Sequence, residues 1–389
     1  MKVAINVLSQ SPGHSTGALS WFLQFSRIVP SRDPGTDYVL IAGRKDVQFY
    51  RDKNPTMVVA GTGWGNSRRL LRVLSEHLLL SGALKREKAD ILFQGGSGVA
   101  PLFLPRRVKL VLAIWGMQHV ASSDIRWEQK LYRSLFFKPG LRRADIILVN
   151  SAYTREMLMA HYGNIRAPVE VVHHGVDLDL FRPGPLAVQD QASLARRGAG
   201  QPYVLFVGQI YPYKKLNVLA DAFCRAISSA SLPHRLVVVG SFGRADSMGA
   251  SYRRQIEAVM ETAGLRDRLV LMEDVNVQEL RALYANAALY VQPSVSETFG
   301  RTVIEAMACG APVLAARAAA TPEILGDAGR YYQAQDVEEC ASQILAIVGD
   351  ESVRQDLVAR GLRRAKDFSY DTEVDKLIAL LHRVQRQDR

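Results

Sequence analysis

Cysteine is scarce in this sequence. The 389 residues contain three cysteines, Cys224, Cys309 and Cys340, which lie far apart and lack the spacing of a zinc site. So few thiols exclude a disulfide framework and agree with a reducing compartment. We therefore expect a fold that is held by its apolar core rather than by covalent or metal cross-links.

Long apolar runs are also missing. No stretch reaches the roughly 18–20 apolar residues that a membrane-spanning helix needs. Residues 1–14 carry one lysine and a short apolar run, which predicts a first β-strand and not a signal peptide. With 48% hydrophobic and 22% charged residues, the composition is typical of a globular protein, and the length favours two domains. We expect a cytoplasmic protein.

Acidic residues are in short supply in the first half only. Residues 1–180 hold 24 Lys and Arg against 14 Asp and Glu, whereas the remaining residues hold 25 against 24. Nearly all of the net charge of +11 therefore belongs to the first half. Such an imbalance favours an anionic partner: a membrane surface, a phosphorylated substrate or nucleic acid. Nucleic acid is disfavoured, because no recognition motif is present.

Short apolar runs alternate with amphipathic stretches along the whole chain. Continuous apolar strands separated by helices predict a parallel sheet that is covered on both faces, as in doubly wound α/β folds. Expected strands lie at 2–9, 37–43, 56–61, 90–96, 109–115, 145–150, 169–175, 203–208, 234–241, 268–273, 288–294 and 311–316.

The strand series pauses once, which divides the chain. We expect a Rossmann-like domain over 1–180, a linker over 181–200 with at most one short helix, and a second Rossmann-like domain over 201–371. The end of the chain, about 372–389, has a leucine-rich helical face and is expected to return to the first domain. Ligands of such sheets bind beyond the carboxyl ends of the strands, which favours a central cleft.

One stretch combines two acids with a helix start. In "PSVSETFGRTVIEAMACGAPV" (293–313), a strand ends at Pro293 and a helix begins near Gly300. The N–H groups from Phe299 to Val303 then form an anion site suited to a phosphate, which Gly300 lets approach closely. Glu305, among apolar neighbours, suits ribose hydroxyls, and Glu297 suits the hydroxyls of a sugar. The spacing fits ribose, diphosphate and sugar in a row; the alternative is that two glutamates eight residues apart are accidental.

The longer string over 293–329 resembles the donor-site signature of the retaining glycosyltransferases of group 1, family 4, which have the GT-B fold. The resemblance implies a sugar transferred from a UDP- or GDP-linked donor with retained anomeric configuration. Glu297 would then hold the donor sugar and Glu305 the ribose. Phe299, Gly300, Arg301 and Val303 would lie at the diphosphate.

A second match to the family is "VGQIYPYKKLNVLADAF" (207–223). Lys214 stands where the family has a lysine on the diphosphate. Gln209 stands where an arginine is usual, so one positive charge is missing. Lys215 is placed to compensate for it. All three are donor-binding candidates, and Lys214 is also a catalytic one.

Candidate acceptor residues lie in the first half. A loop with Gly13, His14 and Gly17 follows the first strand and resembles the family's glycine-rich loop. His119 matches a later histidine of the family, which would bond the donor sugar or the reacting centre, and it is the third catalytic candidate, beside Glu297 and Lys214. The alternative for His119 is a structural role. Trp115 and Gly116 occupy the place where the family often has an acid. His174 falls in a hinge motif and is expected to be structural.

The resemblance also implies a mechanism without a protein nucleophile. The leaving diphosphate helps to deprotonate the acceptor, and lysine and helix dipole replace a metal ion. The pair Asp177 and Asp179 matches the Asp-x-Asp that binds Mn²⁺ in a different glycosyltransferase fold, but a three-residue match is frequent by chance. We expect neither a metal nor another cofactor besides the nucleotide sugar.

Several alternatives stay open at this stage. The acceptor is a glycan, a lipid-linked sugar or a small molecule, and the base depends on loops such as 272–275. Two basic, leucine- or phenylalanine-rich stretches, 66–88 and 130–143, are either core helices with snorkelling cations or a docking surface for an anionic membrane. The second alternative favours surface polysaccharide or glycolipid biosynthesis. Rival functions are an epimerase or phosphorylase on this scaffold, and a non-catalytic nucleotide-sugar-binding subunit.

Overall fold

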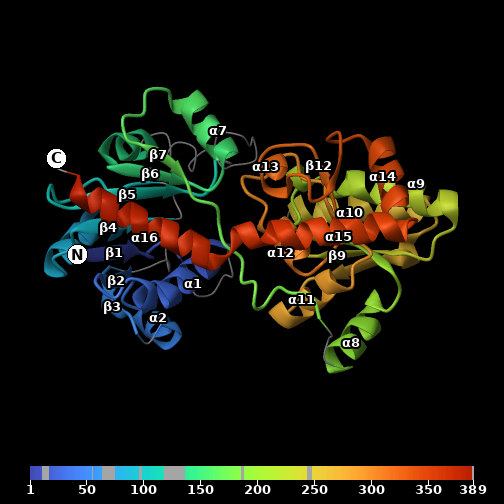
Figure 1. Ribbon diagram of the computed structural model, residues 1–389, viewed down its shortest axis with the longest axis horizontal. Coiled ribbons are helices and arrows are strands. Elements are labelled where there is room, and N and C mark those ends of the chain that lie inside the picture. Colours follow the sequence, from blue (N-terminus) through green and yellow to red (C-terminus); the bar gives the residue numbers. More distant parts are fainter. Residues whose placement is uncertain are drawn as a thin grey trace. The chain divides into compact units, whose positions relative to one another are not determined.

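The computed structural model describes residues 1–10, 17–54, 56–63, 75–95, 99–117, 136–184, 188–242 and 248–387. These residues form two compact units (Figure 1). Unit 1 comprises Met1–His173 together with Tyr370–Arg389, and unit 2 comprises His174–Ser369. Among the described residues, no helix combines the length and the apolar character that a bilayer crossing requires.

Unit 1 is built on a parallel sheet with the strand order β3-β2-β1-β4-β5-β6-β7. Its strands are rich in valine, isoleucine and leucine, and most of their side chains are buried, as expected for a sheet with both faces covered. The strands are β1 (Lys2–Asn6), β2 (Asp37–Ala42), β3 (Val58–Gly61), β4 (Ile91–Gln94), β5 (Lys109–Ile114), β6 (Ile146–Val149) and β7 (Val169–Val171).

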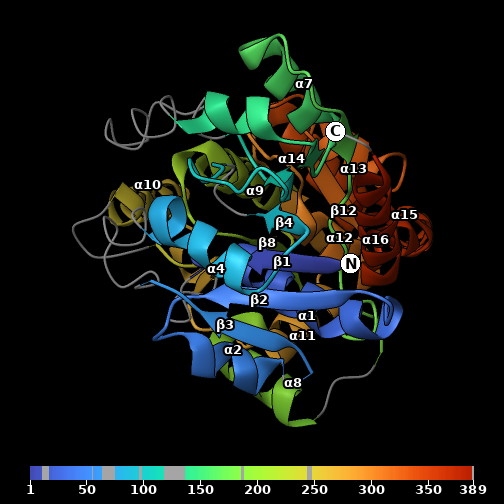
Figure 2. The same cartoon turned by 90° about the vertical axis from the view of Figure 1, so that its left-hand side faces the viewer.

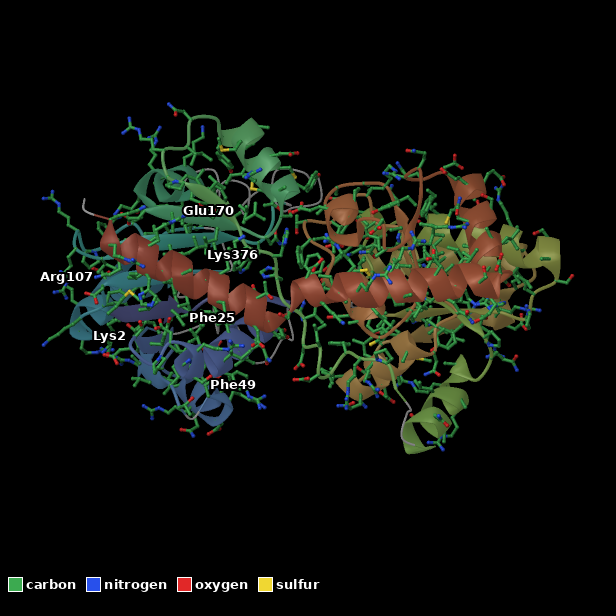
Figure 3. The ribbon with its side chains drawn as sticks, in the orientation of Figure 1. Lys2, Phe25, Phe49, Arg107, Glu170 and Lys376 are labelled. Carbon is green, nitrogen blue, oxygen red and sulfur yellow. The ribbon has the colours of Figure 1, made fainter. Side chains whose placement is uncertain are left out.

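Helices cover the two faces of this sheet. Side chains of α1 (Gly17–Arg32), α2 (Val47–Lys53) and α16 (Tyr370–Arg386) pack on one face. Side chains of α4 (Leu80–Arg86), α7 (Ala152–Tyr162) and the helix at 136–143 pack on the other. Figure 2 shows α4 and α16 on opposite sides of β1. The C-terminal helix α16 therefore lies in unit 1, beside α1, as the labelled Phe25 and Lys376 in Figure 3 illustrate.

Unit 2 repeats the architecture, with the parallel order β10-β9-β8-β11-β12-β13. The strands are β8 (Tyr203–Val207), β9 (Arg235–Val239), β10 (Leu269–Met272), β11 (Leu289–Gln292), β12 (Val313–Ala316) and β13 (Arg330–Tyr332). Helices α9 (Leu216–Ala230), α10 (Met248–Thr262) and α14 (Val337–Val348) cover one face. Helices α11 (Val277–Ala285), α12 (Arg301–Ala308) and α13 (Thr321–Leu325) cover the other, and α15 (Glu351–Ala365) contacts both α12 and α14.

Of the stretch 181–200, which the sequence favoured as a linker, the described residues 181–184 and 188–200 belong to unit 2. They include α8 (Val188–Leu194) and η3 (Ala195–Ala199). Leu194 is buried in the core of unit 2, and Arg197 makes an ion pair with Glu279 of α11. The buried Leu194 side chain and the ion pair of Arg197 explain why this stretch packs on the domain, although its sequence lacks a periodic pattern of apolar residues.

The core of unit 2 predicts a loss of stability at alkaline pH. Burial raises the pKa of Tyr203, Tyr284 and Tyr290 above the ordinary value of 10.0. Above pH 10 the unfolded chain therefore releases tyrosine protons that the folded chain retains, so the free energy of unfolding falls as pH rises. Between pH 9 and 11 we expect a total loss of about 1.4 kcal/mol per tyrosine, measured by urea unfolding. Tyr203→Phe should show a shallower fall, and a flat profile in the wild type would contradict the prediction.

Candidate functional site

The candidate site lies at the carboxyl edge of the unit 2 sheet. Lys214 ends the short helix η4 (Pro212–Lys214), which follows β8, and Glu297 lies in the loop that follows β11. Because β8 and β11 are neighbouring parallel strands, their following loops meet at one edge. Lys214 Nζ donates to Glu297 Oε2 in an ion pair. The sequence predicted both residues, and the structure brings them into contact.

Gln292, the last residue of β11, completes this cluster. Its Nε2 donates to Glu297 Oε2 over 3.3 Å. The hydroxyl of Tyr290 lies 3.3 Å from Gln292 Oε1 and 2.8 Å from Thr302 Oγ1, which holds the amide in place. Both contacts to Glu297 use Oε2, and among the described residues Oε1 has no hydrogen-bond partner. One carboxylate oxygen is thus left to accept a hydrogen bond from a ligand.

Lys214 carries a charge in a buried place. Its side chain and backbone together are only 8% exposed. Burial by itself lowers the pKa of Lys214, but the charge and hydrogen bond of Glu297, helped by Tyr213, outweigh burial, so the pKa is raised above 10.5. The Tyr213 ring centroid lies 5.5 Å from Nζ, within cation–π range. The site therefore holds a permanent ammonium group at neutral pH.

The helix start after Glu297 has the geometry of an anion site. Gly300 caps α12 with φ of 105°, a left-handed conformation that favours glycine. The N-terminal turn of a helix directs N–H groups outward, where they favour an anion. However, Val303 N donates to Gly300 O over 3.0 Å, so the Val303 amide is engaged in closing the first turn. The contact of the Val303 N–H group with a phosphate stays a prediction.

Phe299 contributes to this site through its backbone at most. Its side chain is 3% exposed and packs edge-on against His174 and Phe368, with ring centroids 5.3 Å and 6.2 Å away. This contact also gives His174 the structural place that the sequence predicted. The aromatic cluster anchors the loop that carries Glu297 to the core of unit 2.

Glu305 lies in the second turn of α12 and is 7% exposed. The Tyr284 hydroxyl donates to its Oε2 over 3.0 Å, and Arg301 Nη2 lies 3.6 Å from its Oε1. Burial raises the pKa of Glu305, while the charge of Arg301 and the Tyr284 hydrogen bond lower it, and burial prevails. Arg301 is therefore placed against Glu305, and Tyr284 is the hydrogen-bond partner that the sequence did not reveal.

The other two donor-binding candidates at this edge of the sheet, Lys215 and Gln209, are not part of the ion pair between Lys214 and Glu297. Lys215 is half-buried and adopts the left-handed conformation, with φ of 52°, as the N-cap of α9. Gln209 follows β8 and is exposed, and among the described contacts none joins it to the Lys214–Glu297 pair. The structure therefore supports Lys214 as the central cation of the site.

The loop at 272–275 is braced by residues 193–197. Arg197 Nη2 donates to the Asp274 carbonyl oxygen over 2.9 Å. Arg197 and Ser193 both donate to Glu279, which itself closes a capping box at the start of α11. The brace fixes the backbone of a loop that sequence analysis associated with the choice of base.

Unit 1 shows part of the predicted acceptor side. Gly13, His14 and His119 lie outside the described residues, and Gly17 begins α1. Trp115 follows β5 and packs with its ring 5.1 Å from Trp21, so this place serves the aromatic core. Two polar residues that sequence analysis missed end β1 and β4: Asn6 Nδ2 donates to Gln94 Oε1 over 2.8 Å.

The Asp-x-Asp match has a structural explanation. Asp177 Oδ1 accepts hydrogen bonds from the backbone N–H groups of Asp179 and Leu180, at 3.1 Å and 3.0 Å. Asp177 thus caps a turn. Within the part of the chain that the structure describes, no group of three or more His, Cys, Asp or Glu side chains is placed to hold a metal ion.

Known proteins resemble both halves of the chain. Residues 32–180 match the family Glycosyltransferase Family 4, and residues 201–350 match the family Glycosyl transferases group 1. The D-inositol 3-phosphate glycosyltransferase of Geodermatophilus obscurus is 33% identical over 242 residues, which are 61% of this chain and 52% of that protein. The chain spans about half the length of the curated relatives it matches.

Solved structures resemble nearly the whole chain in fold. A glycosyltransferase from Rickettsia africae has a TM-score of 0.75 at 15% identity, over 100% of this chain and 99% of that one. Anabaena HepE in complex with UDP-glucose has a TM-score of 0.74 at 19% identity, over 98% and 99%. The predicted GT-B class with two Rossmann-like domains is thereby confirmed.

Proposed function

Because the chain belongs to the group 1 and family 4 glycosyltransferases, with a domain of each kind, we propose that it transfers a hexose from a UDP-linked sugar to a hydroxyl group of a small acceptor, with retention of configuration. The observation that carries this proposal is the cluster of buried Lys214 and Gln292 with half-buried Glu297 beside the start of α12. A solved structure of the same fold contains UDP-glucose, which supports the choice of donor.

The cluster suggests how the donor is held. Lys214 has three N–H donors and uses one on Glu297, so the others remain for the diphosphate. Glu297 Oε1 accepts a hydroxyl of the sugar, while Glu305 at the second turn of α12 accepts from the ribose. As the bond to the sugar breaks, negative charge develops on the diphosphate, and the nearby ammonium group and helix start stabilise it. The diphosphate oxygen then takes the proton of the attacking hydroxyl. No protein nucleophile and no metal are needed for these steps.

The acceptor is proposed to be a phosphorylated small molecule. The curated relatives are named for D-inositol 3-phosphate, and the excess of positive charge in the first half suits an anionic acceptor. A lipid-linked acceptor in surface polysaccharide assembly stays a prediction, as does docking on a membrane. Much of the two basic stretches, 66–88 and 130–143, lies outside the described residues.

A donor and acceptor assay tests the proposal. The protein is incubated with UDP-glucose, with and without D-inositol 3-phosphate, in EDTA, and UDP and sugar products are followed by ¹H NMR. UDP release that requires the acceptor, with an α-linked product, supports a retaining transferase. Conversion of UDP-glucose into another nucleotide sugar without an acceptor indicates an epimerase, and a requirement for inorganic phosphate indicates a phosphorylase. Binding of UDP-glucose without turnover of any acceptor favours a non-catalytic subunit.

Replacement of Glu305 by glutamine is expected to weaken donor binding more than transfer. The amide loses the charge that accepts hydrogen bonds from Tyr284 and the ribose. Hydrogen bonds to charged groups contribute about 1.5–3 kcal/mol, so we expect a Kd for UDP raised roughly tenfold or more. Calorimetric titration with UDP and steady-state kcat measure the two effects. A kcat that falls while the Kd is unchanged would contradict the ribose assignment.

A further inference from the structure

A cavity lies in unit 1, away from the residues that end its strands. It has a volume of about 500 Å³ and is lined by Lys138, Leu141, Arg142, Tyr162, Asn164, Ile165 and Arg166. Its walls are the helix at 136–143, which precedes β6, and the end of α7 with the loop before β7. It therefore lies at the amino edge of the sheet, whereas Asn6 and Gln94 end their strands at the carboxyl edge. Acceptors are expected at the carboxyl edge, so this cavity is a separate feature.

The floor and walls of the cavity are fixed by packing. Tyr162 stacks on Phe137, with ring centroids 4.9 Å apart and planes 20° from parallel, which joins α7 to the helix at 136–143. Leu141 is 4% exposed, and Tyr162 and Ile165 pack on the same apolar core. Gly163, with φ of 65°, ends α7 and turns the chain into the wall formed by 164–166. The cavity is thus preformed, with an apolar floor.

The rim of the cavity carries three exposed cations, Lys138, Arg142 and Arg166. Among the described residues, none of the three has a carboxylate within ion-pair distance. Lys138 and Arg142 are four residues apart on one helix, a spacing at which like charges destabilise the helix. The C-terminal ends of the two helices contribute about half a negative charge each, which is too little to balance three cations. The helix packing alone therefore does not account for this set of charges.

We propose that this cavity binds a phosphate group carried by a compact organic body. Two guanidinium groups and an ammonium group match the oxygen atoms of a phosphate, and Asn164 adds an amide donor. The volume exceeds the need of a free phosphate ion, and the floor of Leu141, Ile165 and the Tyr162 ring offers an apolar surface to the remaining part. The ligand is either the headgroup of an anionic lipid or a soluble phosphorylated compound. This site acts independently of the donor cluster in unit 2.

Two probes distinguish the sources. Glycerol 3-phosphate is titrated into the protein by calorimetry at constant ionic strength, with saturating UDP. Flotation uses phosphatidylcholine vesicles with and without phosphatidylglycerol. The pocket variant is Arg142→Gln/Arg166→Gln. The matched control is Arg51→Gln/Lys53→Gln, which removes two exposed charges from α2. This helix packs beside β3, at the opposite end of the strand order from β7 (Figure 1). A further variant, Arg142→Lys/Arg166→Lys, keeps the charge.

We expect the pocket variant to bind at least one probe about tenfold more weakly, while the control binds as the wild type does. Loss confined to vesicles assigns the lipid headgroup, and loss confined to glycerol 3-phosphate assigns the soluble ligand. The lysine variant should retain most of the binding. The proposal is overturned if the wild type binds neither probe, or if the control loses as much binding as the pocket variant. UDP affinity, measured in parallel, reports on unit 2 and separates this outcome from failure of the proposed function.

Discussion

Glu297→Gln is expected to slow sugar transfer roughly 100- to 1000-fold, the usual effect of removing one group that stabilises the transition state. The affinity for UDP should stay the same or increase. The reason is that glutamine cannot neutralise Lys214, whose charge is then fully available to the diphosphate. Steady-state kinetics measure transfer, and calorimetric titration with UDP measures affinity.

The control for this prediction is Glu261→Gln, which removes an exposed carboxylate from the end of α10. It should leave both quantities unchanged. If Glu297→Gln weakens UDP binding as strongly as it slows transfer, then Glu297 does not face the sugar. The distinction between Glu297 and Glu305 would then have to be abandoned.

Lys214→Met is expected to impair both donor binding and transfer, the former at least tenfold and the latter roughly 100-fold or more. Methionine fills the buried place of the lysine but leaves the Glu297 carboxylate with Gln292 as its remaining hydrogen-bond donor among the described residues. That negative charge then faces the diphosphate. Lys366→Met, at an exposed position of unit 2, serves as the control.

A double variant sharpens this test. Lys214→Met/Glu297→Gln removes both charges, so its affinity for UDP should exceed that of Lys214→Met alone. If the effects of the two single substitutions on UDP affinity simply add in the double variant, the ion pair does not act at the donor. Thermal unfolding of each variant verifies that the fold is retained, since a broken buried pair can also destabilise the protein.

The arrangement of strands was largely predictable because buried parallel strands are continuous apolar runs. Each of the twelve expected runs contains an observed strand. The thirteenth strand, β13, was missed since its three residues, Arg330–Tyr332, are too short and too polar for that pattern. Residues 181–200 lacked a periodic signal as well, because their attachment depends on single contacts such as Arg197 with Glu279.

Several residues of the candidate site were named from the sequence, but the contacts that join them were not. Lys214 and Glu297 are 83 positions apart, and they meet only because β8 and β11 are neighbours in the sheet. Gln292 was missed, although a signal was present: an amide at the end of an otherwise apolar buried strand. Tyr284 had no such signal, since a tyrosine in a helix is ordinary until Glu305 is seen beside it.

The ion pair between Lys214 and Glu297 has a consequence for turnover. Together the two side chains carry no net charge, so a diphosphate that lacks its sugar meets both an attractive ammonium group and a repulsive carboxylate. A complete nucleotide sugar avoids this conflict, because its hydroxyl groups donate to the carboxylate. If the proposed function holds, the UDP that remains after transfer of the sugar is held less favourably than the donor was. The pairing would thereby speed the release of product and limit inhibition by UDP that accumulates during the reaction.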